Sequence, residues 1–459
     1  MKTLKQSAAI AAFAASALVL TACSPGSDST IGTPDPTDAT ASTDTEEATS
    51  APVEDATTVT FRLWDDVAGP AYQESFDAFN AQNPDIKVVV DVVGWGDYWE
   101  RMPLDIQSGD MADIFWVNSS GYGIYADNGN LINIDDALGA DHDEWVESAT
   151  SLYNRGGTQW GVPQIWDSIA LFYNKDLVDE AGVDVESLKW SPDGDGDTLI
   201  EAATALTTDA AGLHPGDEGF DPNARETFGF NSQADMQAVY LDFLAQNGAT
   251  FQDEDDNFAF ATDEGAEAFQ YLIDLINEHY VAPSAADTNA DGDLTRSLFM
   301  QGKLGLFQSG PYSLKTIAES AEFDWGIAPL VEGPEGRISV VHSVAAVGNA
   351  DSKNLDATIK VLQWLGSADG QAALASQGVS FPAAVDAQDA FINYWAGQDV
   401  DVQPFIDAAN GETTSPLIGA KGTAGFTTIA PMLNDMFLGE TDVAEDLAAI
   451  QAEGNAAME

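Results

Sequence analysis

Aromatic side chains stand next to short polar ones at several points of the chain, and these pairs are the first candidates for binding chemistry. In the first third of the sequence they are Trp64 with Asp65 and Asp66, Trp95 with Tyr98, and Trp116 with Asn118. An aromatic face stacks on patches of C–H groups, while carboxylates and amides hydrogen-bond to hydroxyl groups. Sugars offer both surfaces. These residues therefore predict a binding site for a polyhydroxylated ring.

Each of these groups follows a segment that is predicted to be a β-strand. The strands are residues 59–64, 86–93 and 113–117, and apolar residues at helical spacing lie between them at 71–82 and 98–107. Strands that alternate with helices predict an α/β fold with a largely parallel sheet, in which ligands bind beyond the carboxyl ends of the strands. Glycines on both sides of Trp95 predict a loop that displays its ring. Trp64 is open to two interpretations, a ligand platform or a core residue.

The same alternation continues towards the C-terminus. Helices are predicted at 175–181, 199–206, 236–246, 265–279, 357–365 and 442–453, and strands at 161–163, 170–173, 305–307, 325–328 and 343–347. After the N-terminal region about 400 residues remain, more than one hydrophobic core usually holds. Two lobes are therefore expected.

The N-terminus carries the signs of export. Lys2 and Lys5 precede an apolar run over residues 8–20, which is too short for the roughly 20 residues of a membrane-spanning helix. The run predicts a signal peptide over residues 1–22. The sequence Leu-Thr-Ala-Cys, ending in the only cysteine, Cys23, resembles the lipobox of bacterial lipoproteins. It implies a diacylated Cys23 and an extracytoplasmic protein anchored to the cell membrane; the alternative is an ordinary secretory signal with a chance cysteine.

Composition separates the tether from the folded part and narrows the ligand class. Residues 24–57 are rich in Thr, Ser, Asp, Pro, Ala and Glu, so 23–57 is predicted to be a lipidated cysteine followed by a disordered tether. The whole chain has 76 acidic and 16 basic residues, a net charge of -60. Such a surface repels polyanions, which argues against nucleic acid and against anionic ligands. It fits either a well-solvated secreted surface or a salt-adapted one.

The segment Trp-Gly-Val-Pro-Gln-Ile-Trp-Asp-Ser-Ile-Ala-Leu-Phe-Tyr-Asn-Lys-Asp over residues 160–176 carries a family resemblance. Further blocks at 113–116, 299–307, 309–312 and 357–370 agree in order and spacing. From residue 58 onward the chain resembles extracellular solute-binding protein family 1, which includes the maltose-binding protein. The resemblance implies the receptor of an ABC importer that captures a carbohydrate and delivers it to permease subunits.

The fold that the resemblance implies is the two-lobed, type II periplasmic-binding-protein fold with a hinge between the lobes. Lobe one would comprise residues 58–165 and 341–385, and lobe two residues 166–340 and 386–459. The ligand would lie between them, and closure would be a hinge motion. The protein is expected to act as a monomer.

Further ligand residues follow from the resemblance alone. Asn118 occupies the family's ligand loop, Asp167 matches the acidic residue on the strand that crosses between lobes, and Tyr312 replaces a common stacking Trp. His342 lies at the return crossing, where a structural role is the alternative. Gln233 and Phe426 complete the expected set.

Two acidic segments raise the question of calcium. Asp193-Gly-Asp-Gly-Asp197 alternates oxygen ligands but lacks the turn glycine and a closing Glu. The second segment fits better, with candidate ligands Asp287, Asn289, Asp291 and Asp293 around the turn glycine Gly292. Its position twelve is Leu298, so a distant ligand would have to complete the site. The alternative is that both segments are solvated acidic turns without a metal. The predicted function requires no cofactor.

Two other functions have less support in the sequence than a carbohydrate receptor. A lipid-anchored glycoside hydrolase needs two carboxylates at the scissile bond. Because the chain has 76 acidic residues, a pair of carboxylates can always be found and is no evidence for this activity. No nucleophile elbow, phosphate loop or His-Glu-x-x-His motif is present, so the chain is predicted not to be an enzyme. A receptor for a polyamine stays open, because sites built from aromatic and acidic residues also suit ammonium groups.

Overall fold

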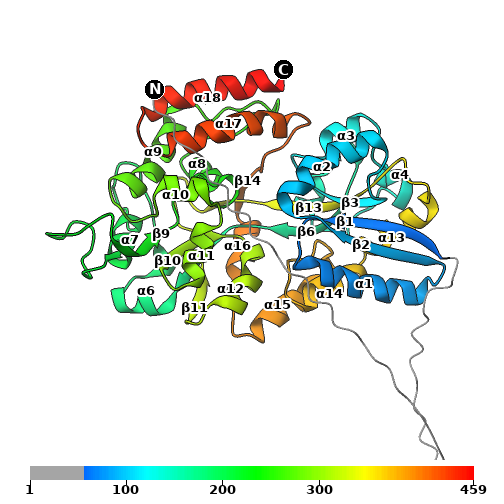
Figure 1. The fold of residues 1–459 in the computed structure, drawn as a ribbon, viewed down its shortest axis with the longest axis horizontal. Coiled ribbons are helices and arrows are strands. Elements are labelled where there is room, and N and C mark those ends of the chain that lie inside the picture. The colour runs from blue at the N-terminus through cyan, green and yellow to red at the C-terminus, as the bar shows by residue number, and fades with distance from the viewer. Residues whose placement is uncertain (1–55) are drawn as a thin grey trace, which may run out of the picture. The chain divides into compact units, whose positions relative to one another are not determined.

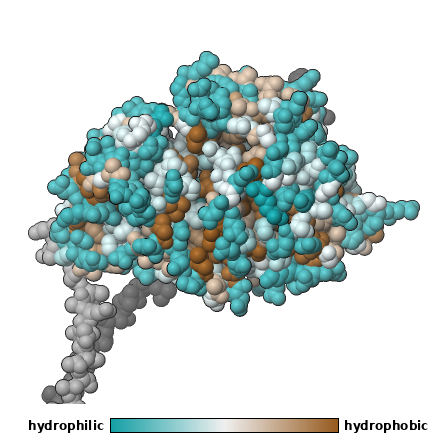
Figure 2. Space-filling view, turned by 180° about the vertical axis from the view of Figure 1, so that it is seen from behind, coloured by the Kyte–Doolittle hydropathy of each residue, from teal (hydrophilic) through white to brown (hydrophobic). Residues whose placement is uncertain are grey.

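The computed structural model describes residues 56–459. The predicted signal peptide, Cys23 and nearly all of the predicted tether lie outside the described residues. Within 56–459 no helix is both long and apolar enough to cross a bilayer. Figure 2 shows one face of the protein, on which hydrophilic residues cover most of the area and hydrophobic residues gather in patches.

The first sheet is five-stranded and carries the N-terminal part of the chain (Figure 1). Its order is β2 (Ile86–Val92), β1 (Thr57–Leu63), β3 (Ile114–Asn118), β13 (His342–Gly348) and β6 (Val162–Asp167). The first three strands are parallel, whereas β13 runs antiparallel to both of its neighbours. Strand β6 therefore runs in the same direction as β1, β2 and β3, so this sheet is largely parallel, as predicted, and β13 is its one exception. The reason is that the chain passes through the second sheet before it returns as β13, which enters in the opposite direction.

The second sheet is also mixed. Its order is β11 (Trp325–Ala328), β7 (Ala170–Asn174), β10 (Leu304–Ser309), β9 (Arg225–Phe230) and β8 (Thr208–Asp209). Only the β9–β10 pair is parallel. Two short ladders complete the strands, β4 (Asn154–Arg155) with β5 (Thr158–Gln159) and β12 (Ile338–Val340) with β14 (Glu412–Thr414).

Helices connect and cover these strands. They are α1 Ala68–Gln82, α2 Trp95–Ser108, α3 Gly123–Asp127, α4 Ile134–Leu138, α5 Glu147–Ser151, α6 Lys175–Ala181, α7 Leu199–Leu206, α8 Leu241–Gln246, α9 Asp263–Asn277, α10 Ala285–Ala290, α11 Leu294–Met300, α12 Leu314–Ser320, α13 Leu355–Leu365, α14 Ala368–Ser376, α15 Gln388–Ala396, α16 Gln403–Asn410, α17 Gly422–Met436 and α18 Val443–Met458. Helix α1 packs on α14, and α17 packs along α18 (Figure 1).

The chain crosses between the two sheets at short connections. Strand β6 ends at Asp167 and β7 begins at Ala170, while β12 ends at Val340 and β13 begins at His342. Trp166 and Asp167, which the sequence assigned to the second lobe, thus end a strand of the first sheet. The division of the whole chain into lobes stays a prediction.

A buried acid on α8 links the second sheet to one of the crossings. Asp242 of α8 is fully buried. Its Oδ1 accepts a hydrogen bond from the backbone N–H of Val340 (2.7 Å), and its Oδ2 accepts one from Nε2 of Gln308 (3.2 Å). Burial raises the pKa of Asp242 well above its ordinary value. These contacts join α8 to β10 and to the end of β12.

Candidate functional site

The crossing strands bring Asp167 and His342 face to face. The two residues are register partners at the ends of β6 and β13. Asp167 is 5% exposed, and its Oδ1 has no hydrogen-bond partner. Burial raises the pKa of Asp167 to about 7, and the negative charge of Asp65 adds to the rise. An unpaired oxygen on a buried carboxylate is costly, so this atom is a prime candidate for ligand contact.

One ring nitrogen of His342 also lacks a hydrogen-bond partner. Its Nε2 is buried without a hydrogen bond, and burial lowers the pKa of the imidazole to about 3. The ring is therefore neutral at physiological pH. A neutral imidazole offers one donor and one acceptor, which suits a hydroxyl group as well as a structural role.

Asp65 is fixed by the start of helix α1. Its Oδ1 accepts hydrogen bonds from the backbone N–H groups of Val67 (2.8 Å) and Ala68 (3.1 Å). Burial raises the pKa of Asp65, and the neighbouring Asp66 adds a smaller contribution. Asp66 itself is exposed. Asp65 thus serves both as a helix-start acceptor and as a charge near Asp167.

Tyr312 stands after β10 on a short 3₁₀ turn, Pro311–Ser313. Its ring lies over Gly310, where an added Cβ would come within 2.2 Å of Tyr312 Cε1. Glycine at 310 is therefore required for this ring position. Burial raises the pKa of Tyr312, and the charges of Asp235 and Asp167 both contribute. The phenol thus lies within electrostatic range of two carboxylates, one at the end of β6 and one that caps the helical turn starting at Met236.

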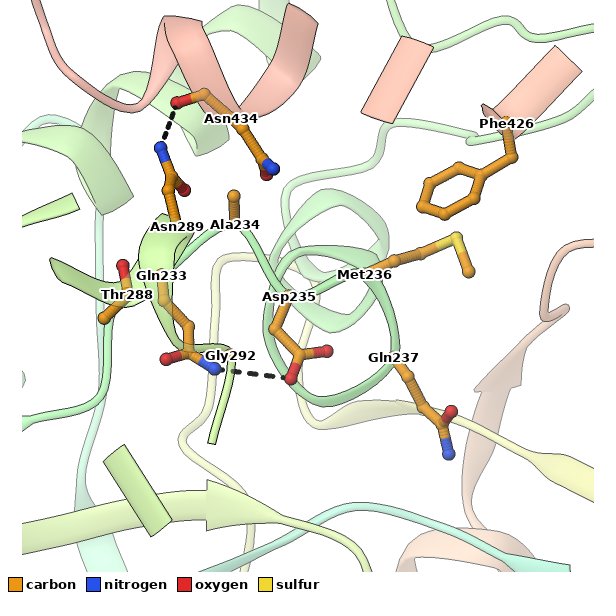
Figure 3. Close-up of a pocket in the computed structure, with 10 residues that line it drawn as sticks. All are labelled: Gln233, Ala234, Asp235, Met236, Gln237, Thr288, Asn289, Gly292, Phe426 and Asn434. Carbon is orange, nitrogen blue, oxygen red and sulfur yellow. Dashed lines mark hydrogen bonds between the residues drawn. The ribbon is translucent and has the colours of Figure 1, made fainter. Parts of the chain in front are cut away.

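A cavity of about 330 Å³ lies beside Asp235 (Figure 3). It is lined by Gln233, Ala234, Asp235, Met236, Gln237, Thr288, Asn289, Gly292, Phe426 and Asn434. Met236 points towards Phe426 of α17, while Gln233 and Asn289 approach from the other side (Figure 3). Gln233 and Phe426, which the sequence analysis selected, thus meet at one cavity although 193 positions separate them.

Asp235 is a site residue that the sequence analysis missed. Its Oδ1 accepts a hydrogen bond from the N–H of Ala238 (2.9 Å), and its Oδ2 accepts one from Nε2 of Gln233 (3.4 Å). Burial raises its pKa, although the charge of Arg296 opposes the rise. The signal was present: Asp precedes the predicted helix at 236–246, where acidic residues commonly cap a helix.

An aromatic cluster surrounds Trp64. Its ring centroid lies 5.0 Å from that of Trp116, 5.1 Å from Tyr98, 5.2 Å from Trp99 and 5.4 Å from Trp95. Trp95 begins helix α2 instead of standing in a loop, but its side chain is 57% exposed and offers a free face. Trp99, one helical turn later, was missed.

Trp116 does not offer a platform. It is 1% exposed and packs edge-on against Trp64 and Tyr72. The structure therefore contradicts the prediction that the ring of Trp116 stacks on a ligand. The physical reason is its place in β3, a central strand of the first sheet whose residues Ile114 to Val117 are all buried.

Asn118 and its neighbours make contacts between segments far apart in the chain. Asn118 Oδ1 accepts a hydrogen bond from Ser120 Oγ (3.1 Å). Ser119 Oγ donates to the backbone oxygen of Leu417 (3.1 Å), and Thr423 Oγ1 donates to that of Ser120 (2.9 Å). We call the contact between residues 118–123 and 417–423 the rim bridge. It joins the loop after β3 to the start of α17.

The four calcium candidates do not form an alternating loop. Asp287 and Asn289 lie on helix α10, where Asp287 Oδ2 accepts a hydrogen bond from Ser284 Oγ (2.6 Å) and Asn289 Nδ2 donates to Asn434 O (2.8 Å). Asp291 Oδ1 accepts from the N–H of Asp293, whose carboxylate pairs with Arg296. Across residues 56–459 no three His, Cys, Asp or Glu side chains gather as a metal site. The prediction of a loop with alternating calcium ligands is therefore wrong, because Ser284 caps a helix that contains Asp287 and Asn289.

The comparisons place the chain in a family. The model for bacterial extracellular solute-binding proteins matches residues 64–372, more than half of the sequence. The chain therefore belongs to this family.

Solved structures share the fold. UspC of M. tuberculosis is 41% identical, covers 87% of this chain and 100% of its own, and superposes with a TM-score of 0.73. An ABC substrate-binding protein of Listeria monocytogenes, solved in complex with cycloalternan, is 22% identical over 88% of this chain and 99% of its own, with a TM-score of 0.76. These structures confirm the two-lobed α/β fold.

Curated relatives are named as binding proteins and not as enzymes. A putative binding protein of Brucella abortus is 25% identical over 83% of this chain and 89% of its own length. An arabinooligosaccharide-binding protein of Halalkalibacterium halodurans is 26% identical over 46% and 44%. At the level of the family, these relatives are thus binding proteins.

Proposed function

We propose that this protein is the carbohydrate receptor of an ABC importer. The observation that carries the proposal is the free Oδ1 of Asp167, a buried acceptor at a strand end next to the crossing between sheets. Strand ends of open α/β sheets are where ligands bind. Tyr312 and the exposed Trp95 supply aromatic faces, and His342 supplies a neutral hydrogen-bonding group. The relatives that bind oligosaccharides support the same class of ligand.

The binding test is calorimetry with a panel of mono- and oligosaccharides on the mature chain. Tyr312→Ala should lower the affinity for the bound sugar by about 2–4 kcal/mol, the range of binding hot spots. The unfolding temperature without ligand should change little, because Tyr312 is only partly buried. An unchanged affinity with an intact unfolding temperature would remove Tyr312 from the site.

We also propose that the receptor is held at the membrane by lipid on Cys23 and hands its ligand to permease subunits as a monomer. The support is the Leu-Thr-Ala-Cys sequence after an apolar run, together with relatives that are named solute-binding lipoproteins. Two acyl chains give stable membrane attachment, where one chain is marginal.

Cys23→Ala should therefore release the protein from membranes in a host that processes lipoproteins. Cell fractionation and immunoblotting measure the effect, with Cys23→Ser as a second variant that cannot carry a thioether-linked lipid. Recovery of either variant in the membrane fraction at the level of the natural chain would sink the anchoring proposal.

A further inference from the structure

The rim bridge joins two segments that are packed on different sheets. Leu417 is buried in a hydrophobic core with residues from strands of the second sheet, whereas Tyr122 is buried in a core with residues from strands of the first sheet. Figure 1 shows the two segments at α3 and at the start of α17. The bridge therefore links the two halves of the fold at a place where the main chain does not cross between the sheets.

Gln252 fixes the second-sheet side of the bridge. Its Oε1 accepts a hydrogen bond from the N–H of Ile418 (2.8 Å), and its Nε2 donates to the backbone oxygens of Ile418 (3.2 Å) and Asp256 (2.8 Å). One side chain thus holds both backbone polar groups of a residue in the bridge. Because the segment 417–423 is held from behind, movement is expected between the two segments and not within this one.

Gly123 allows the two backbones to touch. A Cβ atom added to Gly123 would lie 3.1 Å from the Cα atom of Ala420 and 3.5 Å from its Cβ atom. A larger side chain at this position would press on a backbone that Gln252 holds in place. The glycine therefore permits a close contact between segments that belong to different cores.

The bridge lies next to residues of the expected ligand set on both sides. Asn118 Oδ1 accepts a hydrogen bond from Ser120 Oγ, and the backbone oxygen of Ser120 accepts one from Thr423 Oγ1. Phe426, which lines the cavity of Figure 3, follows Thr423 by about one turn of α17. The hydroxyl protons of Ser119 and Thr423 are donated to backbone oxygens of the opposite segment and not to a ligand.

We infer that the rim bridge is a latch, which holds the two segments together while a saccharide is bound and must open before the saccharide leaves. This inference rests on the proposed receptor function and adds what controls release. Product release and binding are often limited by such an opening step. Two hydroxyl groups that do not contact the saccharide, those of Ser119 and Thr423, then set part of the release rate.

Gly123→Cys together with Ala420→Cys, in a Cys23→Ser background, locks the latch. The natural chain has no cysteine besides Cys23, and 3.5 Å between the two Cβ positions suits a disulfide. Oxidation of the mature variant should give one intramolecular disulfide, measured by thiol counting and mass spectrometry. Failure of the disulfide to form would show that the two segments do not meet in solution, and would overturn the latch.

The locked variant tests passage of the saccharide. The probe is whichever of glucose, maltotriose and arabinotriose the natural chain binds, in radiolabelled form, and filter binding follows its exchange. Oxidised with the probe bound, the variant should keep it until a reductant is added; oxidised empty, it should not take the probe up. The reduced form of the same variant is the control. Equal exchange by the two forms would show that the saccharide passes without opening of the bridge.

Removal of the two hydroxyl groups tests the latch without a cross-link. Ser119→Ala with Thr423→Val should raise the dissociation rate about tenfold, because two hydrogen bonds are lost. Thr423→Val alone leaves the loop after β3 unaltered and should raise the rate about threefold. Thr428→Val is the matched control, since its hydroxyl donates to Ala424 O (3.1 Å) within α17, and should leave the rate within about twofold. Equal rates for Thr423→Val and Thr428→Val would contradict the latch.

A measurement without saccharide separates the latch from the receptor function. The thiol of Ala420→Cys, in the Cys23→Ser background, faces Gly123 and should react with a thiol reagent about threefold faster when Thr423→Val is added, but not when Thr428→Val is added. This result without binding of any saccharide counts against the receptor function and leaves an opening bridge. Unchanged reactivity in a variant that binds saccharide overturns the latch and leaves the receptor function standing.

Discussion

Asp167→Asn should make the unliganded protein more stable at pH 8 than the natural chain. The pKa of Asp167 is about 7 in the fold, against an ordinary value of 3.8. Between these values the folded state holds a proton that the unfolded state has lost, so stability falls as pH rises from about 4 to about 7 and stays low above that. Asparagine removes this penalty, about 2–4 kcal/mol for a shift of roughly three units.

Urea unfolding at pH 4, 6 and 8 measures the effect. The variant and the natural chain should have similar stability at pH 4 and diverge towards pH 8, while the exposed control Asp386→Asn should follow the natural chain throughout. Parallel pH profiles for Asp167→Asn and the natural chain would contradict the prediction. A stabilising change that weakens binding is the signature of a group kept for function.

Trp64→Ala should cost the fold far more than Trp95→Ala. Trp64 contacts four aromatic rings and packs against two hydrophobic cores, so its removal should cost about 3–5 kcal/mol of unfolding free energy. Trp95 is 57% exposed, and its removal should change stability by about 0.5 kcal/mol or less.

The same pair of variants distinguishes a core residue from a ligand platform. We expect Trp95→Ala to weaken saccharide binding by about 2–4 kcal/mol at an almost unchanged unfolding temperature. Thermal unfolding followed by calorimetry on each variant gives both quantities. If Trp95→Ala binds as tightly as the natural chain, the aromatic face on the first sheet is not part of the site.

Local signals predicted the elements that short-range chemistry determines. Helix α6 matches its predicted bounds because the side chain of Asn174 caps its start and Gly182 takes the left-handed conformation at its end. The antiparallel entry of β13 was not predictable in this way. Its direction depends on the route of the chain through the second sheet, and no feature of residues 342–348 encodes it.

The site residues likewise differ in how far local sequence predicts them. Asp167 and Tyr312 were selected by resemblance, and the structure brings the carboxylate of Asp167 within electrostatic range of the Tyr312 hydroxyl. Trp116 and Trp64 look alike in sequence, each being a tryptophan at a strand end, yet one is 1% exposed and the other lies partly open. Burial depends on what packs from distant segments. Asp235 was overlooked because capping the helix that follows is by itself a sufficient reason for an Asp at this position.

The rim bridge gives access to conformational measurements on single molecules. The only cysteine of the chain is Cys23, so residues 56–459 contain no native thiol. Cysteines introduced at exposed positions on either side of the bridge, Ala424 and Ile124, accept a donor and an acceptor dye without competition in a Cys23→Ser background. Energy transfer between the dyes then reports the separation of these two segments directly, with and without sugar, in a receptor whose natural fluorescence is crowded by 11 tryptophans.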